Sequence, residues 1–133
     1  MKTITVRSHE REEMIEITDE VQKNLKESGA QEGVCFLFVQ HTTAGLTVNE
    51  NADPDVVRDM LLYLRETIPQ RGLTGAKFRH AEGNSDAHIK ASFFGSSVTV
   101  PFQNNQLLLG RWQGIYLCEF DGGRERKVII MMR

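Results

Sequence analysis

The sequence SVTVPFQNNQLLLGRWQGIYLCEFDGGRERKVIIMM, residues 97–132, gives the strongest indication of how this chain folds. Apolar, β-branched and aromatic residues fill four short runs in it, and turn-forming residues separate these runs. Such runs are typical of β-strands. We therefore expect strands at residues 97–102, 106–109, 114–120 and 127–132. Asp121-Gly122-Gly123 lies between the last two runs and predicts a hairpin that joins them.

The residues before this stretch predict further strands and two or three helices. Residues 3–7 and 14–17 resemble half-buried strands, and residues 33–40 are almost continuously apolar, which indicates a buried strand. Thr18 is the expected N-cap of a helix that Gly29 ends. A second helix is expected to start at Asp53-Pro54 and to close at Ile68-Pro69, and residues 87–94 form a candidate short third helix.

This order of elements indicates an α+β domain. Strands grouped apart from a few helices are typical of a mainly antiparallel sheet, here with two or three helices. No repeat, low-complexity tract or linker divides the sequence, so residues 1–133 are expected to form a single domain.

Composition excludes several classes of protein. The net charge of −2 argues against a nucleic-acid partner, which a basic surface would attract. No apolar run approaches the roughly 20 residues of a membrane span, and the first residues lack the apolar core of a signal peptide. The two cysteines, Cys35 and Cys118, lie in apolar runs and are expected to be buried free thiols. We therefore expect a cytoplasmic protein without membrane contact.

The segment HAEGNSDAH, residues 80–88, is the densest group of chemically active side chains. It holds two imidazoles, two carboxylates and an amide around a glycine, in a chain with four histidines. The glycine lets the backbone fold back, so that His80 and His88 can face one centre, as a metal site or an acid/base site requires. The alternative is a solvated turn, because this spacing is not a standard zinc motif. The residues concerned are His80, Glu82, Asn84, Asp86 and His88.

Two other polar segments are candidates for binding. His41-Thr42-Thr43 follows the buried strand of residues 33–40, where a strand would fix the position of catalytic groups. The alternative is that the two threonines only end that strand with hydroxyl groups bonded to the backbone. Ser96 and Ser97 follow a glycine and can bind an anion together with Lys90, or they form only a turn into the next strand.

The remaining unusual residues are more readily explained by structure. Trp112, the only tryptophan, is expected to be a packing anchor between strands, with a ligand or subunit contact as the alternative. Arg124 and Arg126 flank the predicted hairpin, where cations are usually solvated. No serine or cysteine lies in a nucleophile-elbow context, which gives covalent catalysis little support.

Three long motifs resemble those of the YjbQ-like family, which has long been catalogued as uncharacterised. They are HTTAGLTVNENADPDV at residues 41–56, HAEGNSDAHIKAS with GSS at residues 80–92 and 95–97, and GRWQGIYLCEF with Arg124 and Arg126 after residues 110–120. The resemblance implies a compact α+β fold, assembly as a homotrimer and a divalent metal at the histidine-rich site. It also implies a weak, secondary thiamine-phosphate synthase activity, which is credited to some members.

The resemblance assigns roles to residues of this chain. The implied metal ligands are His41, His80 and His88. The implied catalytic residues are His41, Glu82, Asp86 and His88. The further candidate ligand-binding residues are Thr42, Thr43 and Asn84, together with the anion donors Lys90, Ser96 and Ser97 already considered from the sequence itself. Three imidazoles favour zinc or a similar metal, although magnesium is the usual metal of enzymes that act on diphosphates.

Three functions follow as hypotheses. The first is a thiamine-phosphate-synthase-like enzyme, in which a metal stabilises a departing diphosphate. The second is a metal-dependent hydrolase or lyase of a small phosphorylated metabolite, with Glu82 or Asp86 as the base. The third is a non-catalytic trimer that binds a metal or a metabolite. In each case the expected partners are further copies of the chain and a small phosphorylated metabolite.

Overall fold

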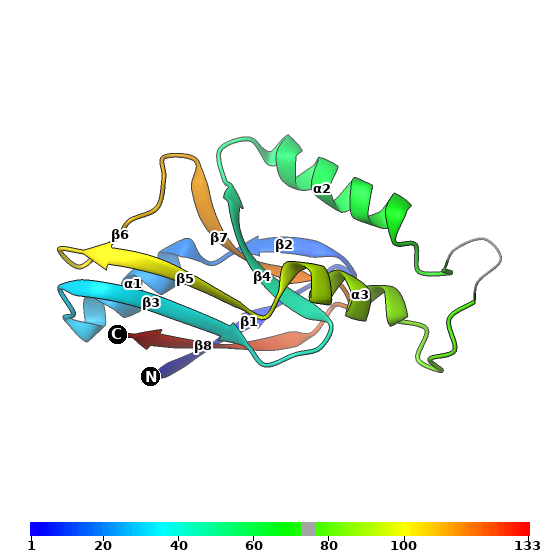
Figure 1. Cartoon of the computed structure of the whole chain (residues 1–133), viewed down its shortest axis with the longest axis horizontal. Helices are drawn as coiled ribbons and strands as arrows, with labels where there is room; N and C mark the ends of the chain where they lie inside the picture. The colour runs from blue at the N-terminus through cyan, green and yellow to red at the C-terminus, as the bar shows by residue number, and fades with distance from the viewer. Residues whose placement is uncertain (73–76) are drawn as a thin grey trace.

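The computed structural model describes residues 1–72 and 77–133, and within them it shows two antiparallel sheets and three helices (Figure 1). One sheet has the strand order β1-β8-β3-β5-β6 and the other the order β2-β7-β4. The strands are β1 (Lys2–Arg7), β2 (Glu13–Glu16), β3 (Glu32–Val39), β4 (Ala44–Glu50), β5 (Ser97–Gln103), β6 (Gln106–Leu107), β7 (Gln113–Glu119) and β8 (Glu125–Met132). The helices are α1 (Thr18–Ser28), α2 (Pro54–Thr67) and α3 (Ser85–Phe94). The predicted α+β class is confirmed.

The main core lies between the two sheets and α1. Buried and more exposed residues alternate along much of β1 and β3, as expected for strands with one covered face. Val21 and Leu25 of α1 are fully buried against this core, one helical turn apart, as their spacing predicts. Apolar burial of this kind, at roughly 25 cal/mol per Å², is the main stabilising contribution to the fold.

One predicted connection is wrong, and one strand was not predicted. Asp121-Gly122-Gly123 does not form a hairpin, because β7 and β8 belong to different sheets: β7 pairs with β2 and β4, and β8 pairs with β1 and β3. The segment instead carries the chain from one sheet to the other. Strand β4, which extends from Ala44 to Glu50 along β7, was not predicted from the sequence.

The start of α1 also differs from the prediction. Ile17 occupies the N-cap position, and no side chain among the described residues caps the helix. The hydroxyl of Thr18 donates to Glu16 at 2.8 Å and accepts from the backbone N–H of Ile115 at 2.8 Å, so it joins the helix to β7. Gly29 does end the helix, with the left-handed φ of 71° that glycine adopts easily.

The structure also bears on the predictions for the two cysteines, for Trp112 and for membrane spans. Cys35 and Cys118 are free and buried, as predicted, and burial raises the pKa of the Cys35 thiol to about 11. Trp112 is 53 % exposed, with the guanidinium of Arg111 4.7 Å from its ring centroid, so the predicted packing role is wrong. Among the residues that the structure describes, none of the helices has the length and hydropathy to cross a membrane.

The antiparallel pairing brings the end of β3 and the beginning of β5 together at one end of the five-stranded sheet, near β8. Because β3 runs opposite to β5 and β8, its last residues lie beside the first residue of β5 and the first half of β8: Phe38 pairs with Ser97, and Val39 with Val128. Helix α3 packs against β4 near this end of the sheet. The loops that leave these elements surround a hollow that contains most of the predicted site residues.

Candidate functional site

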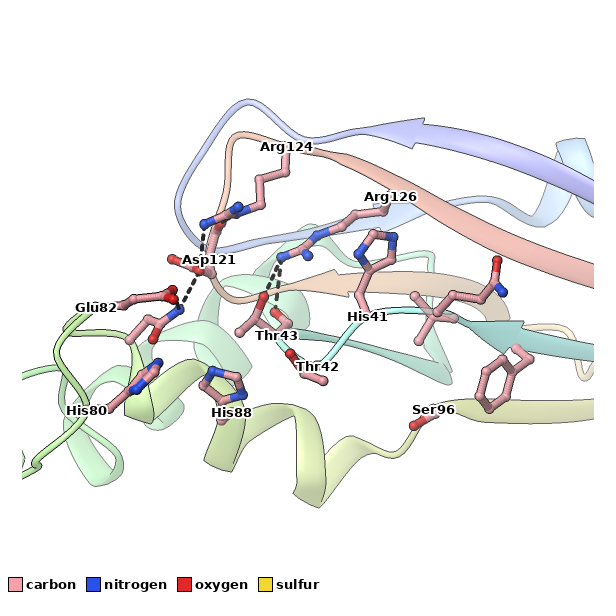
Figure 2. A pocket seen from close by; sticks show the side chains of 14 residues that line it. His41, Thr42, Thr43, His80, Glu82, His88, Ser96, Asp121, Arg124 and Arg126 are labelled. Carbon is pink, nitrogen blue, oxygen red and sulfur yellow. Dashed lines mark hydrogen bonds and ion pairs between the residues drawn. The ribbon is translucent and has the colours of Figure 1, made fainter.

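An open hollow with a volume of about 690 Å³ lies where these loops meet (Figure 2). Residues from five parts of the chain line it: the end of β3 and the loop after it, the segment before α3, α3 itself, Ser96 just before β5, and the segment that leads into β8 with the start of β8. Its lining residues are Phe38, Val39, Gln40, His41, Thr42, Thr43, His80, Glu82, Asn84, His88, Ser96, Asp121, Arg124 and Arg126. Segments that are distant in sequence therefore form one polar site.

The structure brings His80 and His88 together on one side of this hollow. Their ring centroids are 5.5 Å apart, and the rings are nearly perpendicular, with an interplanar angle of 80°. His80 lies in the loop before α3 and His88 on α3, so the turn of this loop places one ring against the edge of the other. Two imidazoles bound to one tetrahedral cation at about 2.1 Å have centroids roughly 5 Å apart. The pair therefore has the chemistry and the separation of two metal ligands.

His41 does not join this pair. Its Nε2 accepts a hydrogen bond from the backbone N–H of Lys127 at 2.9 Å, which turns the ring toward β8 (Figure 2). Burial, together with the positive charge of Arg126, lowers the pKa of His41 and favours the neutral ring that this bond requires. Among residues 1–72 and 77–133, no three His, Cys, Asp or Glu side chains are gathered as metal ligands would be. The predicted convergence of three imidazoles is therefore not present in this conformation.

Two residues of the predicted set lie on the buried face of α3 rather than in the hollow. Asp86 is completely buried and accepts hydrogen bonds from both terminal nitrogens of Arg11, at 3.0 and 3.1 Å, and from Lys90 at 2.8 Å. Lys90, only 1 % exposed, also donates to Glu12 at 3.1 Å. We call Arg11, Glu12, Asp86 and Lys90 the closed cluster, because neither Asp86 nor Lys90 lines the hollow.

The positions of residues around the axis of α3 explain why Asp86 and Lys90 do not line the hollow. Residues 86 and 90 are one turn apart and share a face, whereas residue 88 is about 200° from residue 86 around the helix. When His88 faces the hollow, Asp86 and Lys90 must face the protein interior. Burial opposes ionisation of Asp86, but the hydrogen bonds from Arg11 and Lys90 outweigh it and lower the pKa. Asp86 is therefore an ion-pair partner and not an accessible base, and Lys90 is not an anion donor.

The remaining predicted residues divide between the hollow and its surroundings. Thr42, Glu82 and Ser96 are exposed and line it, whereas Ser97 begins β5 and does not. The Asn84 amide donates to Asp121 at 2.9 Å and, more weakly, to Glu82 at 3.4 Å. Its carbonyl oxygen is buried and has no hydrogen-bond donor among the described residues. A buried acceptor of this kind requires an explanation, and a ligand group is one.

Arg126 is the functional candidate that sequence reasoning missed. It is 3 % exposed, and its Nε donates to Glu119 at 2.8 Å while one terminal nitrogen, Nη2, donates to the same carboxylate and to Thr43 Oγ1, the latter at 2.9 Å. Ser8 also donates to Glu119, at 2.6 Å. We call Ser8, Thr43, Glu119 and Arg126 the open cluster, because Arg126 and Thr43 line the hollow.

A sequence signal for the open cluster did exist. Glu119 lies within the predicted strand of residues 114–120, and Arg126 directly precedes the predicted strand of residues 127–132. Buried charges in strands are paired, so the two residues were candidates for each other. Burial opposes the ionisation of Glu119, but the hydrogen bonds from Arg126 and Ser8 outweigh it and lower the pKa.

Comparison with known proteins places this site in a family. The sequence profile described as "UPF0047 protein YjbQ-like" matches residues 2–133. UPF0047 protein YugU of Bacillus subtilis is 48% identical over 132 residues, which cover 99% of this chain and 98% of that protein. UPF0047 protein MJ1081 of Methanocaldococcus jannaschii is 43% identical over 125 residues, covering 94% and 88%.

Solved structures agree with the sequence relatives. The crystal structure of a YjbQ/UPF0047 family protein from Clostridium acetobutylicum superimposes with a TM-score of 0.94 at 45% identity, over 100% of both chains. The conserved hypothetical protein TT1486 from Thermus thermophilus gives a TM-score of 0.90 at 41% identity, again over 100% of both chains. The match extends over the whole fold and the segments that line the hollow. The chain belongs to the YjbQ-like UPF0047 family.

Proposed function

We propose that the hollow is the active site of a metal-dependent enzyme that acts on a small phosphorylated metabolite. The observation that carries this proposal is the pair of imidazoles, His80 and His88, at 5.5 Å in a polar hollow. Edge-to-face contacts also occur in ordinary aromatic packing, but here both rings are solvent-accessible and line a polar hollow together with Glu82, Thr42 and Ser96. A shared cation would account for this placement, because imidazole is a common ligand of transition metals.

The donor set favours zinc or a similar ion over magnesium. Magnesium prefers an octahedron of oxygen ligands, which an imidazole pair does not offer. A bound transition metal would supply Lewis-acid stabilisation of the charge that develops on a departing phosphate or diphosphate. His80 and His88 would hold this ion. His41 would join them only by giving up the hydrogen bond that it accepts from Lys127.

The reaction class that we favour is displacement of a diphosphate, as in thiamine-phosphate synthesis. There the carbon–oxygen bond to the diphosphate of a pyrimidine methyl group breaks, and its electron pair leaves with the diphosphate oxygen. A ring nitrogen of a thiazole phosphate forms the new bond to that carbon. The hydroxyl groups of Thr42 and Ser96 line the hollow and can donate to the departing oxygens.

Hydrolysis or elimination on a small phosphorylated metabolite is the second candidate, because Glu82 is accessible. This carboxylate is exposed and lines the same hollow as the imidazole pair. A general base must reach the proton that it removes, and Glu82 is placed to take one from water or from a substrate carbon. Asp86, the other base considered from the sequence, is excluded from this role by its burial against Arg11 and Lys90.

The proposed enzyme is a cytoplasmic homotrimer. Two free, buried thiols are typical of a reducing compartment. Helix α2 has no buried residue although it carries apolar side chains, and Tyr63 on it is 69 % exposed. An apolar helix surface without a cover is typical of proteins that associate. A non-catalytic trimer that only binds metal or metabolite would share these features, and turnover is what distinguishes it from an enzyme.

Metal binding by wild-type protein and by two histidine variants tests the proposal. After reconstitution with zinc we expect about one ion per chain. His88→Ala should lose more than the 10–100-fold in affinity that loss of an outer-shell partner typically costs. His9→Ala is the matched control, because His9 is exposed and does not line the hollow.

Turnover on a panel of phosphate and diphosphate esters then separates the candidates. Release of pyrophosphate indicates displacement, release of phosphate indicates hydrolysis or elimination, and metal binding without turnover indicates a binding protein. Absence of bound metal after reconstitution would contradict the metal-dependent mechanism. Light scattering on the same samples gives the mass in solution, where a monomer would contradict the trimer.

A further inference from the structure

We infer that Arg126 is the phosphate anchor of the hollow. It would bind the phosphate group of a small-molecule phosphate ester through the edge of its guanidinium that Glu119 and Thr43 leave unused. The inference rests on the proposed function only for the class of ligand. Phosphate binding by Arg126 requires neither a bound metal nor turnover, so it can be tested separately.

The hydrogen bonds of Arg126 show which edge is used and which remains. Nε and Nη2 donate to the two oxygens of Glu119, and Nη2 donates to Thr43. The other terminal nitrogen, Nη1, donates to no group within the described residues and is not among the fully enclosed polar atoms. Since Arg126 lines the hollow, this nitrogen is the part that remains available to a ligand there (Figure 2).

The open cluster prepares this arginine for binding. A free arginine loses considerable side-chain freedom when it binds an anion, which reduces the affinity. Here Glu119 fixes the guanidinium plane in advance, and Ser8 and the backbone N–H of Asp121 hold Glu119 in turn, at 2.6 and 3.0 Å. Little freedom is therefore left to lose. The planar, donor-rich guanidinium then suits phosphate oxygens better than a single ammonium group would.

Neither Glu119 nor Asp121 presents an unpaired carboxylate to a phosphate at Arg126. Glu119 is completely buried, and each of its oxygens already accepts hydrogen bonds, so it does not face the hollow. Asp121 is paired with Arg124, whose Nη2 donates to it at 3.1 Å. Arg124 is bound to the same residue through Nε, at 2.8 Å to the backbone oxygen. The Arg124 side chain is half-exposed, whereas that of Arg126 is almost completely buried, so Arg126 is the better preorganised of the two arginines.

The hollow is larger than a phosphate ion requires. Its volume of about 690 Å³ lies in the range of pockets that hold complete small molecules, roughly 300–1,000 Å³. Figure 2 shows Arg126 on the β8 side and the pair of His80 and His88 on the α3 side. A ligand anchored by its phosphate at Arg126 would thus extend its organic part toward the imidazoles. This arrangement indicates a monophosphate ester of a small molecule as the ligand.

Titration of the intact protein with inorganic phosphate tests the anchor. The protein is stripped of metal with a chelator, and chloride keeps the ionic strength constant. In wild-type protein, phosphate should shift the guanidinium nitrogen resonances of Arg126 in NMR spectra. Arg126→Lys keeps a positive charge near Glu119 but loses the free edge, and we expect its dissociation constant for phosphate to rise by at least about tenfold. Arg111→Lys, an exposed arginine stacked on Trp112, is the matched control and should bind phosphate as wild type does.

Each outcome decides the inference. Phosphate affinity in folded Arg126→Lys equal to that of wild type would overturn it. If Arg126→Lys does not fold, the wild-type spectra decide, and Arg126 resonances that do not respond to phosphate would overturn it too. Phosphate binding at Arg126 without metal binding or turnover would support the anchor while contradicting the proposed enzyme. Turnover by the wild-type protein, combined with unchanged phosphate affinity in Arg126→Lys, would support the proposed enzyme and contradict the anchor.

Discussion

The closed cluster and the open cluster are built from the same kinds of group but differ in what their cations face. In each, a completely buried carboxylate, Asp86 or Glu119, holds a nearly buried cation, Lys90 or Arg126. In the closed cluster the partners of Lys90 are carboxylates of the protein, and the lysine does not line the hollow. In the open cluster Arg126 lines the hollow, and its Nη1 donates to no group among the described residues.

This difference shows how a structural ion pair is distinguished from a functional one. Burying two charges costs several kcal/mol per ion, and only good geometry with additional hydrogen bonds offsets that cost. Both clusters have such hydrogen bonds, so burial and pairing do not separate them. The two clusters differ in whether their cation has access to the hollow. We infer that the closed cluster fixes α3, and with it His88, whereas the open cluster presents a donor to a ligand.

The largest effect is expected from breaking the closed cluster. Asp86→Ala removes the carboxylate that Lys90 and Arg11 share and leaves a buried ammonium group with Glu12 as its remaining partner. Removal of one partner from a buried pair typically costs about 3–5 kcal/mol, and we expect this loss in the free energy of unfolding. Urea denaturation at neutral pH measures it.

The control for this experiment is an exposed ion pair of the same composition. Asp59 pairs with Arg58 on the surface of α2, with both side chains mostly exposed. Asp59→Ala should leave the denaturation midpoint close to that of wild type, because exposed pairs contribute little. If Asp86→Ala were as stable as Asp59→Ala, the closed cluster would not be what fixes α3.

A smaller effect is expected when acid protonates the carboxylates of the two clusters. Asp86 and Glu119 both have pKa values below their ordinary ones, because hydrogen bonds from cations outweigh the effect of burial. The unfolded chain therefore binds protons first, and the stabilisation is fully present above the ordinary pKa values of about 4. It is lost as the pH falls through the lower values of the folded protein.

Two isosteric variants divide this acid sensitivity between the clusters. The free energy of unfolding of wild type should decline as the pH drops below about 4. Asp86→Asn and Glu119→Gln should each be less stable than wild type at neutral pH and should each show a shallower decline. Denaturation curves over this range measure both. A variant with the wild-type slope would show that its carboxylate does not carry the acid sensitivity.

The sequence was sufficient for the elements that local pattern determines. Alternation identified β1, continuous apolar runs identified β3, and Asp53-Pro54 marked the start of α2, where Asp53 indeed accepts from the backbone N–H of Asp55. Pairing between distant strands was not predictable in this way. Strand β4, with glycine, asparagine and glutamate among its seven residues, is a strand because β7 lies beside it.

In the candidate site, too, local arrangements were predictable from the sequence and contacts between distant residues were not. His80 and His88 are close in sequence around a glycine, and the structure brings them together. The position of His41 depends on a backbone N–H 86 residues away, that of Lys127, and no local pattern contains this information. The burial of Asp86 and Lys90 follows from helical phase, but only once α3 is known to begin at Ser85 rather than at residue 87.

The smallest effect concerns the pKa of His41, and it tests whether the open cluster acts on the hollow electrostatically. Burial and the charge of Arg126 lower this pKa, while the charge of Glu119 opposes them. Glu119→Gln removes the opposing negative charge and leaves the arginine protonated. We therefore expect the pKa of His41 to fall further below its ordinary value of about 6.5, as measured by NMR titration of its ring C–H resonances.

The closed cluster supplies the control for this titration. None of its groups contributes to the shift of His41, so Asp86→Asn should leave the pKa of His41 at the wild-type value. The hydrogen bond from Lys127 to Nε2 requires a neutral ring, so resonances of the Lys127 amide should change at the same pH as those of His41. A pKa of His41 that rises in Glu119→Gln would mean that the guanidinium has moved away from the hollow, and that Glu119 does not act on His41 through its charge alone.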